Sequence, residues 1–238
     1  PFASAPAIRN EDALNMIVQA ANAAAEDTSL DVACGPGLLA CAFARVVRHA
    51  SGIDMTPAML EQAKRVQQEQ GLNNLSWRQG DVTSLPYPDA DFSIVSSRFV
   101  LHHLEEPLTV LREMVRVCQP GGRVVIADMA PVPEKADALN AAERLRDPSH
   151  VRAMPPEELI GLFSKAGLGK PQVTSYRMEG ELEDLLSRSF PNEGNADRLR
   201  QIFADSIAGN SLDLNTRREK GKIYYSFPVV ILVAKKGS

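Results

Sequence analysis

The sequence predicts an α/β fold: a doubly wound, seven-stranded, mostly parallel sheet with a helical insertion before the last strand. From Leu30 to Ala130, short apolar runs alternate with amphipathic stretches, as in repeated strand-helix-strand units. The apolar run Ser226–Ala234 predicts a last strand with neighbours on both sides, and the charged, helix-like segment Glu181–Lys222 precedes it. With 44% hydrophobic and 24% charged residues, the 238-residue chain can bury a sizeable core.

Five short runs, several of them rich in Val and Ile, predict the parallel strands of this sheet. They are Leu30–Cys34, Ala50–Asp54, Leu75–Gln79, Phe92–Ser96 and Arg123–Met129. The alternating segment Val173–Met178 and the run Ser226–Ala234 complete the seven strands.

Helices are predicted between the strands and near the start of the chain. The best marked is Thr56–Gln70, where Thr56 can cap, Pro57 takes the first helical position and Gly71 ends the helix. The others are Asn10–Ala25, Leu38–Val47, Pro107–Cys118, Ala136–Leu145 and Pro156–Ala166.

Charge and composition exclude several classes of protein. A net charge of -4 and a pI near 5.7 leave no excess of Lys and Arg for a phosphate backbone, so no nucleic-acid partner is expected. The chain lacks a run of about 18 apolar residues, so no membrane span is expected. The three cysteines, Cys34, Cys41 and Cys118, fit neither a disulfide framework nor a metal site, which predicts buried packing and a cytoplasmic location.

The turn after the first predicted strand carries the main functional signal. Its sequence, LDVACGPG from Leu30 to Gly37, leads from a strand through two glycines into a helix. Glycines let the backbone approach a ligand at the carboxyl edge of an open sheet, where such folds bind ligands. The spacing Gly35-x-Gly37-x-x-Ala40 also satisfies the dinucleotide fingerprint, so a nicotinamide or flavin enzyme has to be considered.

Three aspartates lie near the ends of the first three predicted strands. Asp54 follows Gly35 by 19 positions, where a carboxylate can bind both hydroxyls of a ribose. Asp81 can accept from an exocyclic amine such as that of adenine, and Asp31 suits an ammonium group better than a pyrophosphate. An aspartate at a strand end is also often only a turn or helix cap, and this alternative stays open for Asp54 and Asp81.

Five motifs occur in order along the chain: LDVACGPG, GIDMTPAML, QGDVTSLPYPDADFSIV, SSRFVLHHLEEP and VCQPGGRVVIAD. This series resembles the class I S-adenosylmethionine-dependent methyltransferases (methyltransferase type 11), in particular the quinone C-methyltransferase-like branch. The resemblance is close over about Leu30–Gly167 and looser over Glu181–Ala234. It implies a Rossmann-like methyltransferase fold, S-adenosylmethionine as cofactor and S-adenosylhomocysteine as product.

The resemblance also implies roles for individual residues. Asp31 would bind the methionine part of the cofactor and Asp54 the ribose. Met55 would pack on the adenine, while Asp81 and Val82 would recognise its edge. The other implied cofactor-binding residues are Ala33, Cys34, Gly35, Gly37, Met59, Gly80, Ser97 and Arg98, with Ala33 standing where many members of the family carry glycine.

Three histidines are candidates for a catalytic base. His102 and His103 follow the fourth predicted strand, beside the methyl-donor end, and His150 lies in a polar loop after the fifth. Imidazole titrates near neutral pH, so each could accept a proton from an O–H, N–H or activated C–H group. The alternative is a histidine that packs on the cofactor or bonds to the backbone. Methyl transfer needs a base only if the nucleophile is protonated, because alignment and water exclusion do most of the work.

The expected protein is one domain, residues 1–238, acting as a monomer or homodimer. Residues 1–29 form an N-terminal helical cover, 30–178 the cofactor-binding core, 179–224 a helical insertion or lid, and 225–238 the last strand. The expected acceptor is a small, planar organic molecule methylated on O, N or activated C, enclosed by the N-terminal segment, Pro131–His150 and Glu181–Lys222. The alternatives are a nicotinamide-dependent oxidoreductase, which leaves Asp81 unexplained, and a non-catalytic cofactor-binding protein.

Overall fold

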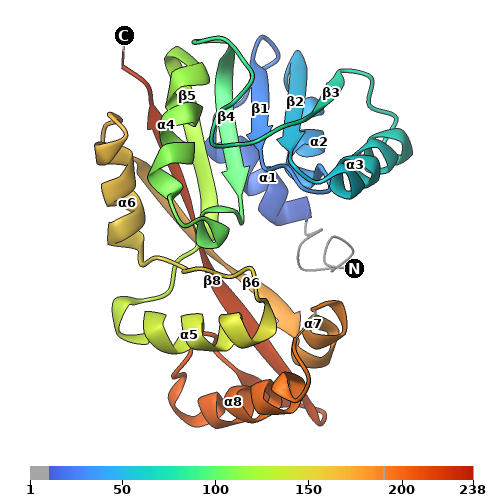
Figure 1. Ribbon diagram of the computed structural model, residues 1–238, viewed down its shortest axis with the longest axis vertical. Helices are drawn as coiled ribbons and strands as arrows, with labels where there is room; N and C mark the ends of the chain where they lie inside the picture. Colours follow the sequence, from blue (N-terminus) through green and yellow to red (C-terminus); the bar gives the residue numbers. More distant parts are fainter. Residues whose placement is uncertain (1–10, 190, 238) are drawn as a thin grey trace.

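The computed structural model describes residues 11–189 and 191–237 and contains an eight-stranded sheet in the order β3-β2-β1-β4-β5-β8-β6, with β7 paired to β8 (Figure 1). The strands are β1 (Thr28–Val32), β2 (His49–Asp54), β3 (Leu75–Gln79), β4 (Phe92–Arg98), β5 (Cys118–Met129), β6 (Gln172–Glu181), β7 (Arg217–Glu219) and β8 (Lys222–Lys235). β1 to β5 are parallel, whereas β8 is antiparallel to both β5 and β6. The strand order reverses between β1 and β4, and open α/β sheets bind ligands at such a point.

Helices pack on both faces of the sheet. They are α1 (Glu11–Ala20), α2 (Leu38–Ala44), α3 (Pro57–Glu69), α4 (Pro107–Val117), α5 (Pro133–Arg146), α6 (Pro156–Lys165), α7 (Leu182–Arg188) and α8 (Asn195–Gly209), with a 3-10 turn at Leu101–His103. One core cluster includes Ile17 of α1 and Phe43 of α2, and the other includes Leu111 of α4 and Phe163 of α6. Each such side chain stabilises the fold by about 1.5 to 3 kcal/mol on burial.

β6 and β8 continue past the ends of the parallel strands and carry a second group of elements (Figure 1). We call this group the helical lobe; it consists of α5, α7, α8, β7 and the adjoining ends of β6 and β8. In it, α5 packs on α8 and α7 packs on β8. The Tyr225 ring meets Phe203 and Phe227 nearly edge-on, with centroids 5.7 and 4.9 Å apart. These aromatic residues belong to the same core cluster as Ile17 and Phe43, so the lobe is packed continuously onto one face of the sheet.

The structure confirms the predicted α/β fold and all seven predicted strands. An eighth strand is present because the chain reverses at Lys220 and Gly221, both with positive φ, so that β7 pairs with β8. The last strand has neighbours on both sides, as expected. The cysteines are free and buried, which confirms their predicted packing role.

Two local predictions were wrong. The N-terminal helix ends at Ala20 rather than Ala25, and Asn22 just beyond it is left-handed (φ 48°); the predicted start, Asn10, lies outside the described residues. The Thr56 side chain makes no cap bond to α3. Instead its backbone N–H donates to Asp54 Oδ1 at 2.9 Å, so the acid of the preceding strand fixes the start of this helix.

Candidate active site

The turn after β1 is built from left-handed backbone. Ala33, Gly35 and Gly37 have φ values of 53°, 51° and 75°. A Cβ at Gly37 would lie 2.4 Å from the Trp77 ring, so only glycine fits there. A non-glycine residue adopts this conformation at a cost of about 1 to 2 kcal/mol, so Ala33 is strained. The Cys34 side chain is buried below the turn, and this burial raises the pKa of its thiol.

Asp54 connects this turn with the ends of β2 and β3. Its Oδ2 accepts from the Gly35 N–H at 2.8 Å and its Oδ1 from the Thr56 N–H at 2.9 Å. Its carbonyl accepts from the Gly80 N–H at 3.1 Å. The capping role that the sequence left open is therefore present. Each carboxylate oxygen still has a further lone pair with which to accept from a ligand.

Asp31 is buried within β1, beside β4. Ser96 Oγ donates to Asp31 Oδ1 at 3.1 Å. Burial raises the pKa of the Asp31 carboxyl to about 7, against the opposing effects of Ser96 and Arg98. Because an opposite charge favours the ionised form, a cationic ligand group at this position would be strongly stabilised. The hydroxyl of Ser97, the residue after Ser96 on β4, already donates a hydrogen bond to the Val32 carbonyl at 2.8 Å.

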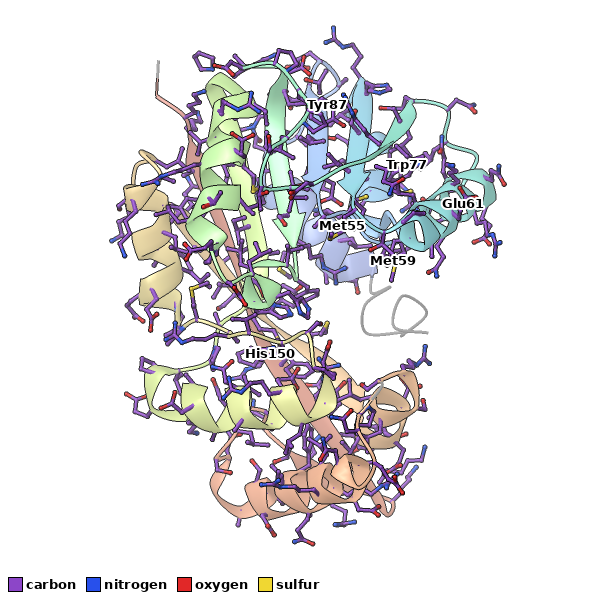
Figure 2. The ribbon with its side chains drawn as sticks, in the orientation of Figure 1. Met55, Met59, Glu61, Trp77, Tyr87 and His150 are labelled. Atoms are coloured by element: carbon purple, nitrogen blue, oxygen red, sulfur yellow. The ribbon has the colours of Figure 1, made fainter. Side chains whose placement is uncertain are left out.

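The predicted adenine-binding residues lie at the outer end of the same edge. Asp81 is exposed, and its Oδ1 accepts from the Thr83 N–H at 2.8 Å, which lowers the pKa of the carboxyl. Met55 is 70% exposed and Met59 is half-buried, and Figure 2 shows both at the same edge. Val82 packs at the margin of the core. The structure thus brings the predicted residues of β1, β2 and β3 to one edge of the sheet.

His102 is held by a buried acid that the sequence reasoning missed. Its Nδ1 is hydrogen-bonded to Asp128 Oδ1, at the end of β5. Asp128 also accepts from the N–H groups of Leu101 and Met129, at 2.8 and 2.7 Å. Burial alone would raise the pKa of the Asp128 carboxyl, but the His102 ring and these bonds hold it below its usual value. Since Asp128 is ionised, His102 Nδ1 donates to it, and Nε2 is the ring nitrogen that Asp128 does not engage.

The other two candidate histidines lie close to His102, with ring centroids 4.2 Å away for His103 and 5.5 Å for His150. His103 Nδ1 donates to the Ser149 carbonyl at 3.1 Å, and burial lowers the pKa of this ring. His150 Nε2 donates to Asn140 Oδ1 at 2.7 Å, and burial lowers its pKa to about 4. His150 is therefore neutral near pH 7.

A cavity of about 550 Å³ lies between the ends of β4 and β5 and the helical lobe. On the sheet side it is lined by Phe99, His102, His103 and Met129. On the lobe side its lining includes the side chains of Met178, Leu185, Tyr225 and Phe227. His150 is buried and is not one of these lining residues; it lies between the sheet and α5 (Figure 2). The volume suits a small organic molecule.

Charged side chains of the cavity wall are paired. Arg146 donates to Glu143 Oε2 from Nε at 2.9 Å and from Nη2 at 2.6 Å, with both residues buried in α5. The four pairs are Glu143–Arg146, Asp184–Arg188, Glu179–Arg217 and Glu181–Lys222, at 2.6, 2.6, 2.9 and 3.2 Å. The wall is thus an apolar surface crossed by neutralised ion pairs.

Comparisons with known proteins agree with this architecture. A family model described as a methyltransferase domain matches residues 30–126. The uncharacterized methyltransferase YcgJ of Bacillus subtilis is 34% identical over 192 residues, 80% of this chain and 75% of that protein. The YcgJ crystal structure matches with a TM-score of 0.86 and 26% identity, covering 95% of this chain and 99% of that one. A demethylmenaquinone methyltransferase of Oceanobacillus iheyensis is 37% identical over 107 residues, 44% of this chain and 45% of that protein.

The chain therefore belongs to the methyltransferase family and is a class I S-adenosylmethionine-dependent methyltransferase. None of the helices in the described part of the chain has the length and apolar character needed to cross a membrane. Within residues 11–189 and 191–237, no three His, Cys, Asp or Glu side chains are grouped so as to hold a metal ion.

Proposed function

We propose that this enzyme transfers the methyl group of S-adenosylmethionine to a small, planar organic acceptor bound in the cavity. The observation that carries the proposal is the position of the cavity. Phe99 and His102 in its wall directly follow β4, and β4 pairs with β1, the strand that leads into the glycine turn. Cofactor and acceptor would therefore meet at one edge of the sheet.

The residues at this edge fit the cofactor. Asp54 would accept from the ribose hydroxyls, and Asp31 would bind the ammonium group, for which a buried carboxylate is suited. Met55 supplies exposed apolar surface for the adenine, and Asp81 an exposed carboxylate for its amine. When bound, the cofactor supplies a methyl carbon that its sulfonium makes electrophilic.

His102 is our candidate for a catalytic base. Asp128 fixes the ring and its tautomer, which leaves Nε2 to accept a proton from the acceptor. His103 borders the cavity as well but bonds to Ser149. His150 bonds to Asn140, so we assign it the role of tying α5 to the loop that precedes α6. The apolar wall excludes water and aligns the acceptor.

The insertion, residues 179–224, would act as a lid over the acceptor. Three observations support this role: α7 lines the cavity, β7 lines it through Arg217, and both belong to the helical lobe rather than to the parallel sheet. A lid opens more readily than the sheet, so its amide hydrogens should exchange faster. They should become protected when acceptor and S-adenosylhomocysteine are both bound. Equal exchange in every state would contradict the lid.

Two measurements test the proposed function. Calorimetric titration should show saturable binding of S-adenosylhomocysteine and none of NADH; the reverse result would favour an oxidoreductase. Radiolabelled methyl transfer should then be screened on planar phenols and quinols, with a demethylmenaquinone included because one relative carries that name. Cofactor binding without methylation of any acceptor in a broad screen would favour a non-catalytic role.

A further inference from the structure

We infer that the acceptor is an uncharged, hydroxylated molecule, and that Glu143 and Tyr225 of the helical lobe bind its hydroxyl group. This inference rests on the proposed function, since it concerns the molecule that occupies the same cavity.

Glu143 presents an unused oxygen to the cavity. Both of its bonds to Arg146 end on Oε2. No donor among the described residues bonds to Oε1, although the residue is 1% exposed and borders the cavity. Glu143 Oε1 is not fully buried, so it keeps some accessible surface. A carboxylate oxygen in an apolar wall is a strong acceptor for a ligand O–H group.

Tyr225 presents a hydroxyl to the same cavity. Its ring is fixed between Phe203 and Phe227. Residue 180 on the paired strand β6 is glycine, and a Cβ there would lie 2.3 Å from the Tyr225 hydroxyl. Within the described part of the chain no residue bonds to this hydroxyl, although Tyr225 is 4% exposed. Buried tyrosine hydroxyls usually have a partner, so a ligand is expected to supply one.

Glu143 and Tyr225 both border this cavity, on its lobe side. Burial and, after it, the charge of Glu143 raise the pKa of the Tyr225 phenol. A ligand hydroxyl can donate to Glu143 Oε1 and accept from the Tyr225 O–H, which satisfies both groups. Since both belong to the lobe whereas Phe99 follows β4, this hydroxyl differs from the atom presented to the cofactor.

The ion pairs of the wall indicate an uncharged ligand. Each arginine of the wall, Arg146, Arg188 and Arg217, already has a carboxylate partner. A phosphate or carboxylate on the acceptor would therefore be desolvated without a cation to neutralise it. A cationic group at Glu143 would meet the guanidinium of Arg146, which already neutralises that acid. A neutral hydroxyl avoids both costs.

The test compares three probes that differ in one group: 2-naphthol, 2-methoxynaphthalene and 2-naphthoate. Their binding to the enzyme saturated with S-adenosylhomocysteine is followed by naphthalene fluorescence. We expect 2-naphthol to bind about 10-fold or more tightly than either of the others, because only it is neutral and can donate to Glu143. Tyr225→Phe and Glu143→Gln should each reduce this preference several-fold and leave the affinity for S-adenosylhomocysteine unchanged.

Tyr87→Phe is the matched control, since Tyr87 packs on Phe92 away from the cavity and should keep the wild-type preference. If Glu143→Gln fails to fold because Arg146 loses its partner, Tyr225→Phe alone decides. Equal binding of 2-naphthol and 2-methoxynaphthalene, tightest binding of 2-naphthoate, no binding of 2-naphthol, or an unchanged preference in Tyr225→Phe would each overturn the inference. Absence of S-adenosylhomocysteine binding would instead count against the proposed function.

Discussion

The two halves of the candidate site are built in different ways. The cofactor edge comes from the ends of β1, β2 and β3, and backbone N–H groups hold its key acid, Asp54. The acceptor cavity takes side chains from α5, α7 and four strands, and paired charges cross its apolar wall. Under the proposed function, the first half would recognise one fixed cofactor through turn geometry. The second half is set by side chains, which can change without altering the sheet, so under the proposed function it would determine the acceptor.

The largest expected effect lies where the two halves meet. His102→Ala should lower kcat by about 10²-fold or more, because it removes the proposed base, while the affinity for S-adenosylhomocysteine changes little. Steady-state kinetics with the identified acceptor, together with calorimetry, check both expectations. His49→Ala is the control, since His49 bonds to Ser76 at the far end of β2. A normal kcat in His102→Ala would mean that the enzyme works by alignment alone.

An effect of similar size, but on cofactor affinity, is expected when Asp54 is replaced. Asp54→Ala should weaken binding of S-adenosylhomocysteine by about 2 to 3 kcal/mol, because charge-assisted bonds to two hydroxyls are lost. Calorimetry measures the loss. Asp205→Ala, an exposed change on α8, should have no effect. If affinity is retained in a folded Asp54→Ala protein, Asp54 does not bind the ribose.

Two buried groups, Asp31 at the cofactor edge and His150 beside the cavity, should also differ in the sign of their pH dependence. The pKa of Asp31 is raised to about 7, so between about pH 4 and 7 this carboxyl is protonated in the folded protein and ionised in the unfolded chain. Its contribution to the free energy of unfolding therefore falls as pH rises from about 4 to 7. His150, with its pKa lowered to about 4, has the opposite effect: it contributes stability above pH 6.5 that is lost as pH falls toward 4.

Urea denaturation across pH 4 to 8 checks these signs. Each group changes the free energy of unfolding by at most about 1.4 kcal/mol per pH unit. The free energy of unfolding of Asp31→Asn should increase relative to that of the wild type as pH rises to about 7. His150→Asn should remove the stability gained between pH 4 and 6.5. Parallel profiles for wild type and Asp31→Asn would show that Asp31 does not titrate in this range.

The smallest expected effect concerns strain in the glycine turn. Ala33→Gly should raise the free energy of unfolding by about 0.5 to 1 kcal/mol, because relief of the left-handed strain exceeds the entropy cost of glycine. Ala90, also left-handed at φ 57°, provides a matched variant outside the site. Both changes should stabilise the protein in urea denaturation, and only Ala33→Gly should alter affinity for S-adenosylhomocysteine. Destabilisation by Ala33→Gly would contradict this account.

The sequence could place the residues of the proposed cofactor edge together, but not those of the cavity, for a physical reason. Asp31, Gly35 and Asp54 are close in sequence, and parallel strands bring their carboxyl ends to one edge. The same argument could have identified Asp128, which ends an apolar run as Asp54 does. Glu143 and Tyr225 carry no such signal. They meet only because β8 extends beyond the sheet and supports α5 and α7, a geometry that periodicity does not encode.

The positions of the three candidate histidines show the same limit of prediction from sequence. His102 and His103 were expected beside the methyl-donor end, and the structure sets both in the cavity wall. His150 was grouped with them on the basis of its loop, and its neighbours also include Asn140 of α5, ten residues earlier in the chain. The loop's position could be predicted, but the partner of each ring nitrogen depends on tertiary packing.

The central claim is that the cofactor edge and the cavity form one continuous site. A crystal structure of the complex with S-adenosylhomocysteine tests it most directly. We expect the ribose hydroxyls on Asp54, the adenine beside Met55 and Asp81, and the sulfur directed past the end of β4 toward Phe99 and His102. A ligand bound away from the turn at Gly35, or one whose sulfur is directed away from the cavity, would contradict the account.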